Sequence, residues 1–166
     1  MNSRTAKPNH AGPRGRLTLT VTEPSGGTVA LRRVNNIVLR QGAAIIAGLF
    51  AGQTGAAPIN RIRVGFGTEG GDPSLTSLTP PDPPIGPEHL ETSLGPEAFQ
   101  VDATGPRAVK VSIQAVFKPT ANLEGVTEAG LVAGDKLYNQ VVFEPVDLRV
   151  GQDVTFFWEV DFPFGH

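Results

Sequence analysis

Three glycines, Gly65, Gly67 and Gly70, reproduce the Gly-x-Gly-x-x-Gly spacing of a dinucleotide-binding turn. Such a turn binds a pyrophosphate only where a helix begins and aims its backbone N–H groups at the phosphates. The next four residues, 71–74, read Gly-Asp-Pro-Ser, which favours a turn and shows no helical pattern. We therefore expect no nucleotide site at these glycines.

The other residues that could carry chemistry also lack the spacing that chemistry needs. The histidines, His10, His89 and His166, lie far apart and do not have metal-ligand spacing. No serine lies in a Gly-x-Ser-x-Gly elbow, and the chain has no cysteine. Carboxylates are plentiful in residues 69–97, but nothing there indicates the burial that separates the pKa values of an acid–base pair. We expect no enzymatic activity, no cofactor and no bound metal.

Charge is distributed unevenly along the chain, whose net charge is −2. Residues 69–97 contain six acids and no base. Residues 1–16 contain four bases and no acid, namely Arg4, Lys7, Arg14 and Arg16. Such a basic arm is either a solvated terminus or a contact for an acidic neighbour. Nucleic acid is not an expected partner, because the aromatic residues lie near acids and away from the arm.

The length of 166 residues, with 20 glycines and 15 prolines, favours one domain of short strands and many turns. Alternating apolar residues predict strands, and residues 122–132 predict a turn with a short strand. The predicted strands are 17–22, 28–34, 59–66, 108–117, 136–143 and 154–162.

One helix is predicted over residues 37–51, capped by Asn35 or Asn36. Its apolar stretch is too short to span a bilayer, and the N-terminus lacks a secretory h-region, so we expect a soluble protein with no membrane partner. The expected fold is mainly β: a sandwich-like single domain (16–166), one helix packed on a sheet, and an extended arm (1–15).

Residues 69–97 predict a long, acidic, Pro-rich loop with seven prolines. A loop of this length in a compact domain is expected to be functional or to lie against a partner. Four leucines could hold it to the core: Leu75, Leu78, Leu90 and Leu94.

The last predicted strand is rich in aromatic residues. Phe156, Trp158, Val160 and Phe162 alternate along it, and Phe157 breaks the alternation. Aromatic residues on such a strand are more often core than binding surface, so we expect them to be buried.

Several segments share an order and spacing with a known group of proteins. Residues 64–68 read Val-Gly-Phe-Gly-Thr, residues 72–78 Asp-Pro-Ser-Leu-Thr-Ser-Leu, and residues 126–131 Val-Thr-Glu-Ala-Gly-Leu. The further segments are 36–39, 46–49, 58–62, 137–146 and 157–162. Over residues 34–162 the chain resembles small structural proteins of tailed bacteriophages and phage-tail-like particles. It departs from them in its Pro-rich loop and in the arm and hairpin of residues 1–34.

The resemblance implies a non-enzymatic structural subunit of a tail, baseplate, neck or fibre attachment, assembled into a virion in the bacterial host cytoplasm. The implied partners are further copies of the chain and other virion or tail proteins. The resemblance also gives Gly65, Gly67 and Gly130 a structural role in turns.

Two alternatives stay open. A capsid-surface decoration protein would share the β-sandwich and the arm. A host-surface or glycan-binding tail component would expose Tyr138 and Trp158 in a concave site. For the structural subunit we expect assembly through the arm and the loop. The expected contact residues are Arg4, Lys7, Arg14, Arg16, Pro80, Pro81, Pro83 and Pro84.

Overall fold

A computed structural model describes residues 13–165. The predicted arm lies almost entirely outside this range, as do Arg4, Lys7, His10 and His166. The first strands are β1 (Arg14–Thr22), β2 (Thr28–Val38), β3 (Arg61–Gly65), β4 (Glu91–Ser93) and β5 (Phe99–Asp102). The others are β6 (Ala108–Phe117), β7 (Leu123–Ala133), β8 (Lys136–Leu137), β9 (Asn139–Leu148) and β10 (Asp153–Pro163). The helical elements are α1 (Arg40–Phe50) and the 3₁₀ turns η1 (Pro87–His89) and η2 (Pro96–Ala98).

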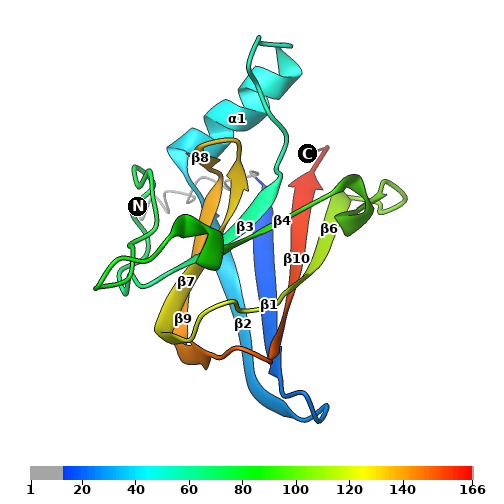
Figure 1. The fold of residues 1–166 in the computed structure, drawn as a ribbon. Coiled ribbons are helices and arrows are strands. Elements are labelled where there is room, and N and C mark those ends of the chain that lie inside the picture. Colours follow the sequence, from blue (N-terminus) through cyan, green and yellow to red (C-terminus); the bar gives the residue numbers. More distant parts are fainter. Residues whose placement is uncertain (1–12, 166) are drawn as a thin grey trace, which may run out of the picture.

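The strands form one antiparallel sheet in the order β4-β3-β7-β9-β2-β1-β10-β6-β5, with β8 paired to β7. The sheet curls into a half-barrel (Figure 1). The prediction of a mainly β fold with one helix is confirmed for residues 13–165. A division into two facing sheets is not confirmed, because hydrogen bonding connects the strands from one edge to the other.

The pairing between β2 and β9 is short. These strands pair only where Ile37 meets Gln140 and Val38 meets Asn139. Farther along, the Arg32 side chain joins them instead. Its Nε and Nη2 donate hydrogen bonds to the backbone oxygens of Glu144 and Pro145, both at 2.9 Å. A guanidinium fork suits this task because it presents several donors in one plane.

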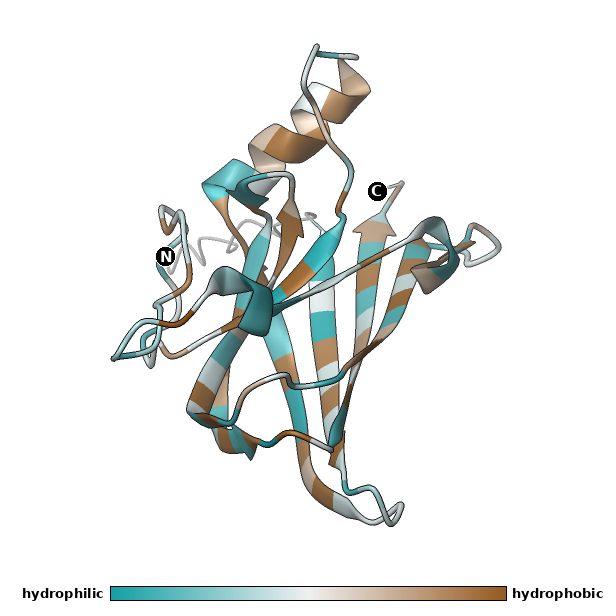
Figure 2. Cartoon of the chain, in the orientation of Figure 1, coloured by the Kyte–Doolittle hydropathy of each residue, from teal (hydrophilic) through white to brown (hydrophobic). Residues whose placement is uncertain are grey.

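Alternate residues of the strands fill the inside of the curl, as the alternating bands of Figure 2 show. Phe156 and Trp158 are fully buried, which confirms the predicted aromatic core. The Trp158 Nε1–H donates a 3.0 Å hydrogen bond to Asn36 Oδ1, so the buried indole nitrogen has its partner. Phe157 points to the other face, where it is half-buried.

The helix begins three residues later than predicted, and neither Asn35 nor Asn36 caps it. Ile37 and Val38 continue β2, and α1 starts after Leu39, whose side chain makes no capping bond. β-Branched residues favour strands, and pairing with β9 decides their conformation. The helix does not lie flat on the sheet. Its first half packs near β8, and its second half projects beyond the end of the sheet (Figure 1).

Residues 69–97 are not one continuous loop, since they contain η1, β4 and η2. Three of the four predicted leucines, Leu78, Leu90 and Leu94, are buried, and Leu75 is half-buried. The backbone is held as well, because the Phe66 N–H donates to the Thr79 oxygen at 3.0 Å. The segment is therefore held at residues 78–79 and again at 90–94, with five of its seven prolines between these anchors.

The strand β7 is the largest departure from the predictions, which placed only a turn and a short strand over 122–132. It runs for 11 residues near the middle of one half of the sheet, and its residues from Val126 onward are buried. With both faces covered, it lacks the alternation that marks a half-buried strand. No helix within residues 13–165 is long and apolar enough to cross a membrane.

Candidate functional site: a buried carboxylate clasp

The Glu128 carboxylate lies inside the protein, on β7 between β3 and β9. The pairing sets Glu128 opposite Gly65 on one side and Val142 on the other, and only 1% of its surface is exposed. Its Oε1 accepts backbone N–H bonds from Gly67 at 3.0 Å and Thr79 at 2.6 Å. A buried charge is stable only when hydrogen bonds replace its water, and these donors do so.

Two neighbouring side chains complete the arrangement. The Gln140 Nε2 donates to Glu128 Oε2 at 2.8 Å and also to the backbone oxygen of Glu69 at 3.2 Å. The Thr127 hydroxyl donates to the backbone oxygen of Gly67 at 2.6 Å. We call Thr127, Glu128 and Gln140 the Glu128 clasp. It holds the backbone at 67, 69 and 79, and so fixes the start of the Pro-rich segment.

Gly65, which ends β3, and Gly67 are both required by the clasp. A Cβ on Gly65 would stand 2.5 Å from Glu128 Oε1 and 2.8 Å from Leu78 Cβ. A Cβ on Gly67 would stand 2.8 Å from both carboxylate oxygens. Neither glycine is among the described residues with positive φ, so the close approach of the carboxylate, and not a left-handed backbone, accounts for both.

The third glycine with a predicted turn role, Gly130, lies within β7 and not in a turn. A Cβ there would stand 2.5 Å from the Asn139 backbone oxygen and 2.5 Å from Leu137 Cδ1. Gly130 thus lets β8 and β9 approach β7 closely. The expected turn is wrong, and the physical reason is again close packing.

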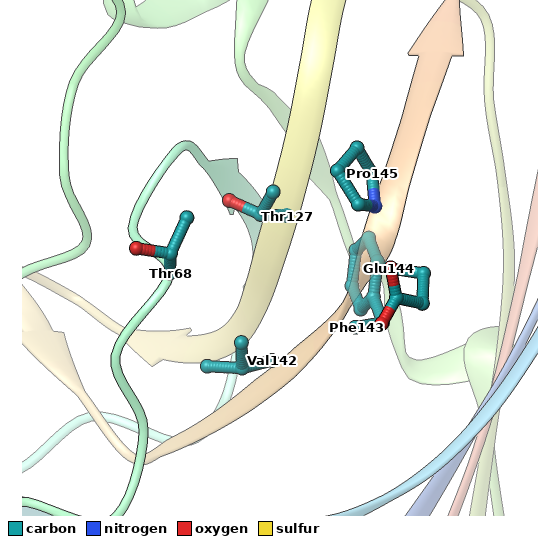
Figure 3. Close-up of a pocket in the computed structure, with 6 residues that line it drawn as sticks. All are labelled: Thr68, Thr127, Val142, Phe143, Glu144 and Pro145. Atoms are coloured by element: carbon teal, nitrogen blue, oxygen red, sulfur yellow. The ribbon is translucent and has the colours of Figure 1, made fainter.

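Two surface hollows flank the loop that the clasp holds. One, of about 440 Å³, is lined by Thr68, Thr127 and the β9 residues Val142, Phe143, Glu144 and Pro145 (Figure 3). The other, of about 370 Å³, is lined by residues that include Phe66, Thr68, Thr79 and Glu128. Within residues 13–165, no group of three or more His, Asp or Glu side chains could hold a metal ion.

The chemistry available at the clasp is that of a structural anchor. Backbone N–H groups and the Gln140 amide occupy the Glu128 carboxylate, and none of these groups transfers protons at neutral pH. The Thr68 and Thr127 hydroxyls have no hydrogen-bonded base among the described residues, so neither is activated as a nucleophile. His89 lies elsewhere, with its Nδ1 2.7 Å from Thr120 Oγ1.

A second charged cluster joins β3 to β4. Glu91 Oε1 lies 3.0 Å from Arg61 Nη1, and Oε2 lies 2.7 Å from Arg63 Nη2. Partial burial of the Glu91 carboxyl favours its neutral form, but the hydrogen bonds from Arg63 and Arg61 outweigh burial. The pKa of Glu91 therefore lies below its usual value of 4.5. This cluster secures the edge strand that ends the Pro-rich segment.

The remaining predicted contact residues fall into two groups, one on β1 and one in the Pro-rich segment. Arg14 and Arg16 lie on β1, paired across from Asp161 and Glu159 of β10. In the sheet, β2, β9, β7 and β3 separate β1 from β4. The predicted contact prolines lie between the clasp and η1. Pro80, Pro83 and Pro84 are exposed, and Pro81 is half-buried.

Sequence reasoning did not single out Thr127 or Gln140 as parts of a site, and it quoted Glu128 only inside a resembling segment. An acid flanked by small and apolar residues was the available signal, because a charge in such a stretch needs buried partners. Comparisons of the chain with protein-family models, with curated proteins and with solved structures found no match.

Proposed function

We propose that this chain is a non-enzymatic structural subunit of a tailed-phage or phage-tail-like particle, in the tail, baseplate, neck or fibre attachment. The observation that carries the proposal is the Glu128 clasp. It joins by hydrogen bonds the segments 64–68, 126–131 and 137–146, which are three of the segments that resemble the phage proteins. Its polar groups hold the backbone at 67, 69 and 79 in place, as a subunit with a fixed contact face requires.

The Pro-rich segment supports a role in assembly. The clasp holds it at one end, and the Glu91 cluster and Leu90 hold it at the other. The part between them presents Pro80, Pro83 and Pro84 to solvent. A segment that is already ordered loses less entropy on binding than a flexible one, so it suits a contact between subunits.

Charge supports a contact between this segment and the basic arm of another copy. The exposed acids Asp82 and Glu88 lie within the Pro-rich part, whereas the arm carries Arg4 and Lys7 and no acid. Opposite charges steer two surfaces into register. We propose that copies of the chain and other virion proteins meet at this segment.

The glycan-binding alternative lacks the feature it requires. It calls for Tyr138 and Trp158 at a concave surface, but Tyr138 is 4% exposed and Trp158 is fully buried. No observation favours a capsid-surface decoration protein over a tail protein. An electron-microscopy map of purified particles separates the two, because it shows whether the chain lies on the head or on the tail.

A deletion tests the proposal. The deletion should remove residues 1–12 and stop there, because Arg14 and Gly15 already belong to β1. We expect the thermal unfolding of the deleted protein to match that of the full chain, and its incorporation into particles to be lost. Deleting only residues 1–3, which removes no charged side chain, is the matched control and should leave incorporation intact. Normal incorporation of the longer deletion would contradict the proposed role of the arm.

A further inference from the structure

After Arg40 at its first position, the helix α1 and the residues that follow it carry no charge over an unusual length. Residues 41–60 contain no Asp, Glu, Lys or Arg. A surface helix normally pairs an apolar stripe with a charged face, whereas a helix apolar all round is found buried. Only Gly42, Ile45 and Gly48 of α1 are buried, and Phe50 is 94% exposed. The projecting half of the helix therefore has the composition of a covered element.

A cavity of about 160 Å³ lies between α1 and the open end of the sheet. Ile46 and Leu49 line it from the helix, and Phe99, Val111 and Phe162 line it from β5, β6 and β10. Its other lining residues are apolar too, except for Tyr138, whose hydroxyl is buried. The cavity is thus suited to an apolar side chain.

The exposed phenylalanine and the cavity lie on one side of α1. Residues four apart stand one above the other on a helix, so Phe50 continues the row of Ile46, and Leu49 continues the row of Ile45. Ile45, Ile46 and Leu49 form the cavity wall, and Phe50 projects beyond its rim. A projecting apolar group and an apolar cavity therefore adjoin on the same surface.

We propose that α1 binds α1 of a second copy of this chain across a twofold axis, with Phe50 of each copy in the cavity of the other. This inference rests on the proposed function, in which copies of the chain meet one another in a particle. A twofold contact needs a patch that complements itself, and a patch that holds both the projecting group and the cavity meets this condition.

The size of the patch sets the expected strength. An 11-residue helix is about 16 Å long, so two such helices bury less than the roughly 1,200–2,000 Å² of a standard stable interface. The contact by itself is therefore weak and depends on concentration. Several such contacts in one particle act together and hold it firmly.

Sedimentation velocity over a concentration series reaching the millimolar range tests the contact in the full chain. We expect a monomer–dimer equilibrium, and we expect Phe50→Asp to raise the dimer dissociation constant by at least about tenfold, a loss of about 1.4 kcal/mol. Val116→Asp is the matched control, because Val116 is also an exposed apolar residue (46%) but lies on the sheet, and it should leave the equilibrium unchanged. Circular dichroism checks that both variants fold.

Cross-linking locates the contact. The chain has no cysteine, so Ala47→Cys introduces a unique thiol on α1. Packed helices lie about 8–10 Å apart, within reach of a short bismaleimide, so we expect a cross-linked dimer. Gln114→Cys, at an exposed position on β6, should give none.

Three results would overturn the inference: a wild-type protein that stays monomeric, a dimer that persists in Phe50→Asp, or Phe50-dependent binding to phosphatidylcholine vesicles by a protein that forms no dimer. None of these affects the proposed function, which is judged separately by incorporation into particles.

Discussion

Replacing Glu128 by glutamine tests the clasp with almost no change in shape. The oxygen of the introduced amide can still accept from Gly67 and Thr79, but these bonds lose the contribution of the negative charge. Hydrogen bonds to charged groups contribute about 1.5–3 kcal/mol, against about 0.5–1.5 kcal/mol for neutral ones. The new amide NH₂ also faces the Gln140 Nε2, which donates to Glu128 at 2.8 Å in the wild type, so two donors meet without an acceptor.

These losses, offset by a smaller cost of burying a neutral group, lower the free energy of unfolding by about 2–4 kcal/mol. For a chain of this size, the melting temperature should fall by about 5–15 °C. Urea unfolding followed by tryptophan fluorescence measures the free energy directly, since Trp158 is the only tryptophan. Hydrogen exchange at the Gly67 and Thr79 amides should accelerate more than exchange on β1.

Two variants serve as controls for the Glu128 experiment. Glu124→Gln removes an exposed acid from the same strand and should change stability by less than about 0.5 kcal/mol. Adding Gln140→Glu to Glu128→Gln restores a donor–acceptor pair and should recover about 1 kcal/mol, although this second substitution removes the bond to the Glu69 carbonyl. A Glu128→Gln protein as stable as the Glu124→Gln protein would refute the reasoning.

Three further predictions concern other residues. Gly65→Ala should lower the free energy of unfolding by about 1–3 kcal/mol, because its Cβ would stand 2.5 Å from the buried Glu128 carboxylate. Gly27→Ala is the control: a Cβ there has nothing within 4 Å, so stability in the same urea assay should not change. Glu91→Gln should lower the free energy of unfolding by about 1 kcal/mol at pH 7. Since the folded-state pKa of Glu91 is lowered, the difference between the two proteins should vanish as the pH falls below 4.5. A difference that stays constant in melts at several pH values would contradict this. Tyr138→Phe should keep or raise stability at pH 7, because the hydroxyl is buried without a hydrogen-bond partner in the described residues. Burial raises the pKa of Tyr138 to about 12, so the wild type should lose stability from pH 10 to 12 relative to this variant, and parallel alkaline melts would count against the assignment.

The strands that the sequence predicts well are those with one face inside the curl. Leu17, Leu19 and Val21 alternate with threonines, and the structure places all three inside the sheet. The strand β7 escaped prediction because both its faces are covered, and because two glutamates and two glycines interrupt it. The start of α1 was misplaced because Ile37 and Val38 suit a strand or a helix, and only pairing with β9 decides between them.

The clasp could not be derived from local patterns, because its parts are far apart in the chain. Glu128 reaches a backbone N–H at Gly67 and another at Thr79, and no spacing rule connects these positions. In the sequence, Gly65 and Gly67 match the spacing of a cofactor-binding motif, and the family resemblance assigns them to a turn. The structure shows that glycine is needed at both positions because of the Glu128 side chain, some 60 residues away, which only the pairing of β3 with β7 brings into contact.

The most direct test of the proposed function is to purify tailed-phage or phage-tail-like particles from cells that carry this gene. Quantitative mass spectrometry and an electron-microscopy map would then be made on the same preparation. The account predicts this chain at fixed stoichiometry in the particle, with its β half-barrel fitted to density in the tail, baseplate, neck or fibre attachment. Finding the chain abundant in the cell extract but missing from purified particles would contradict the account.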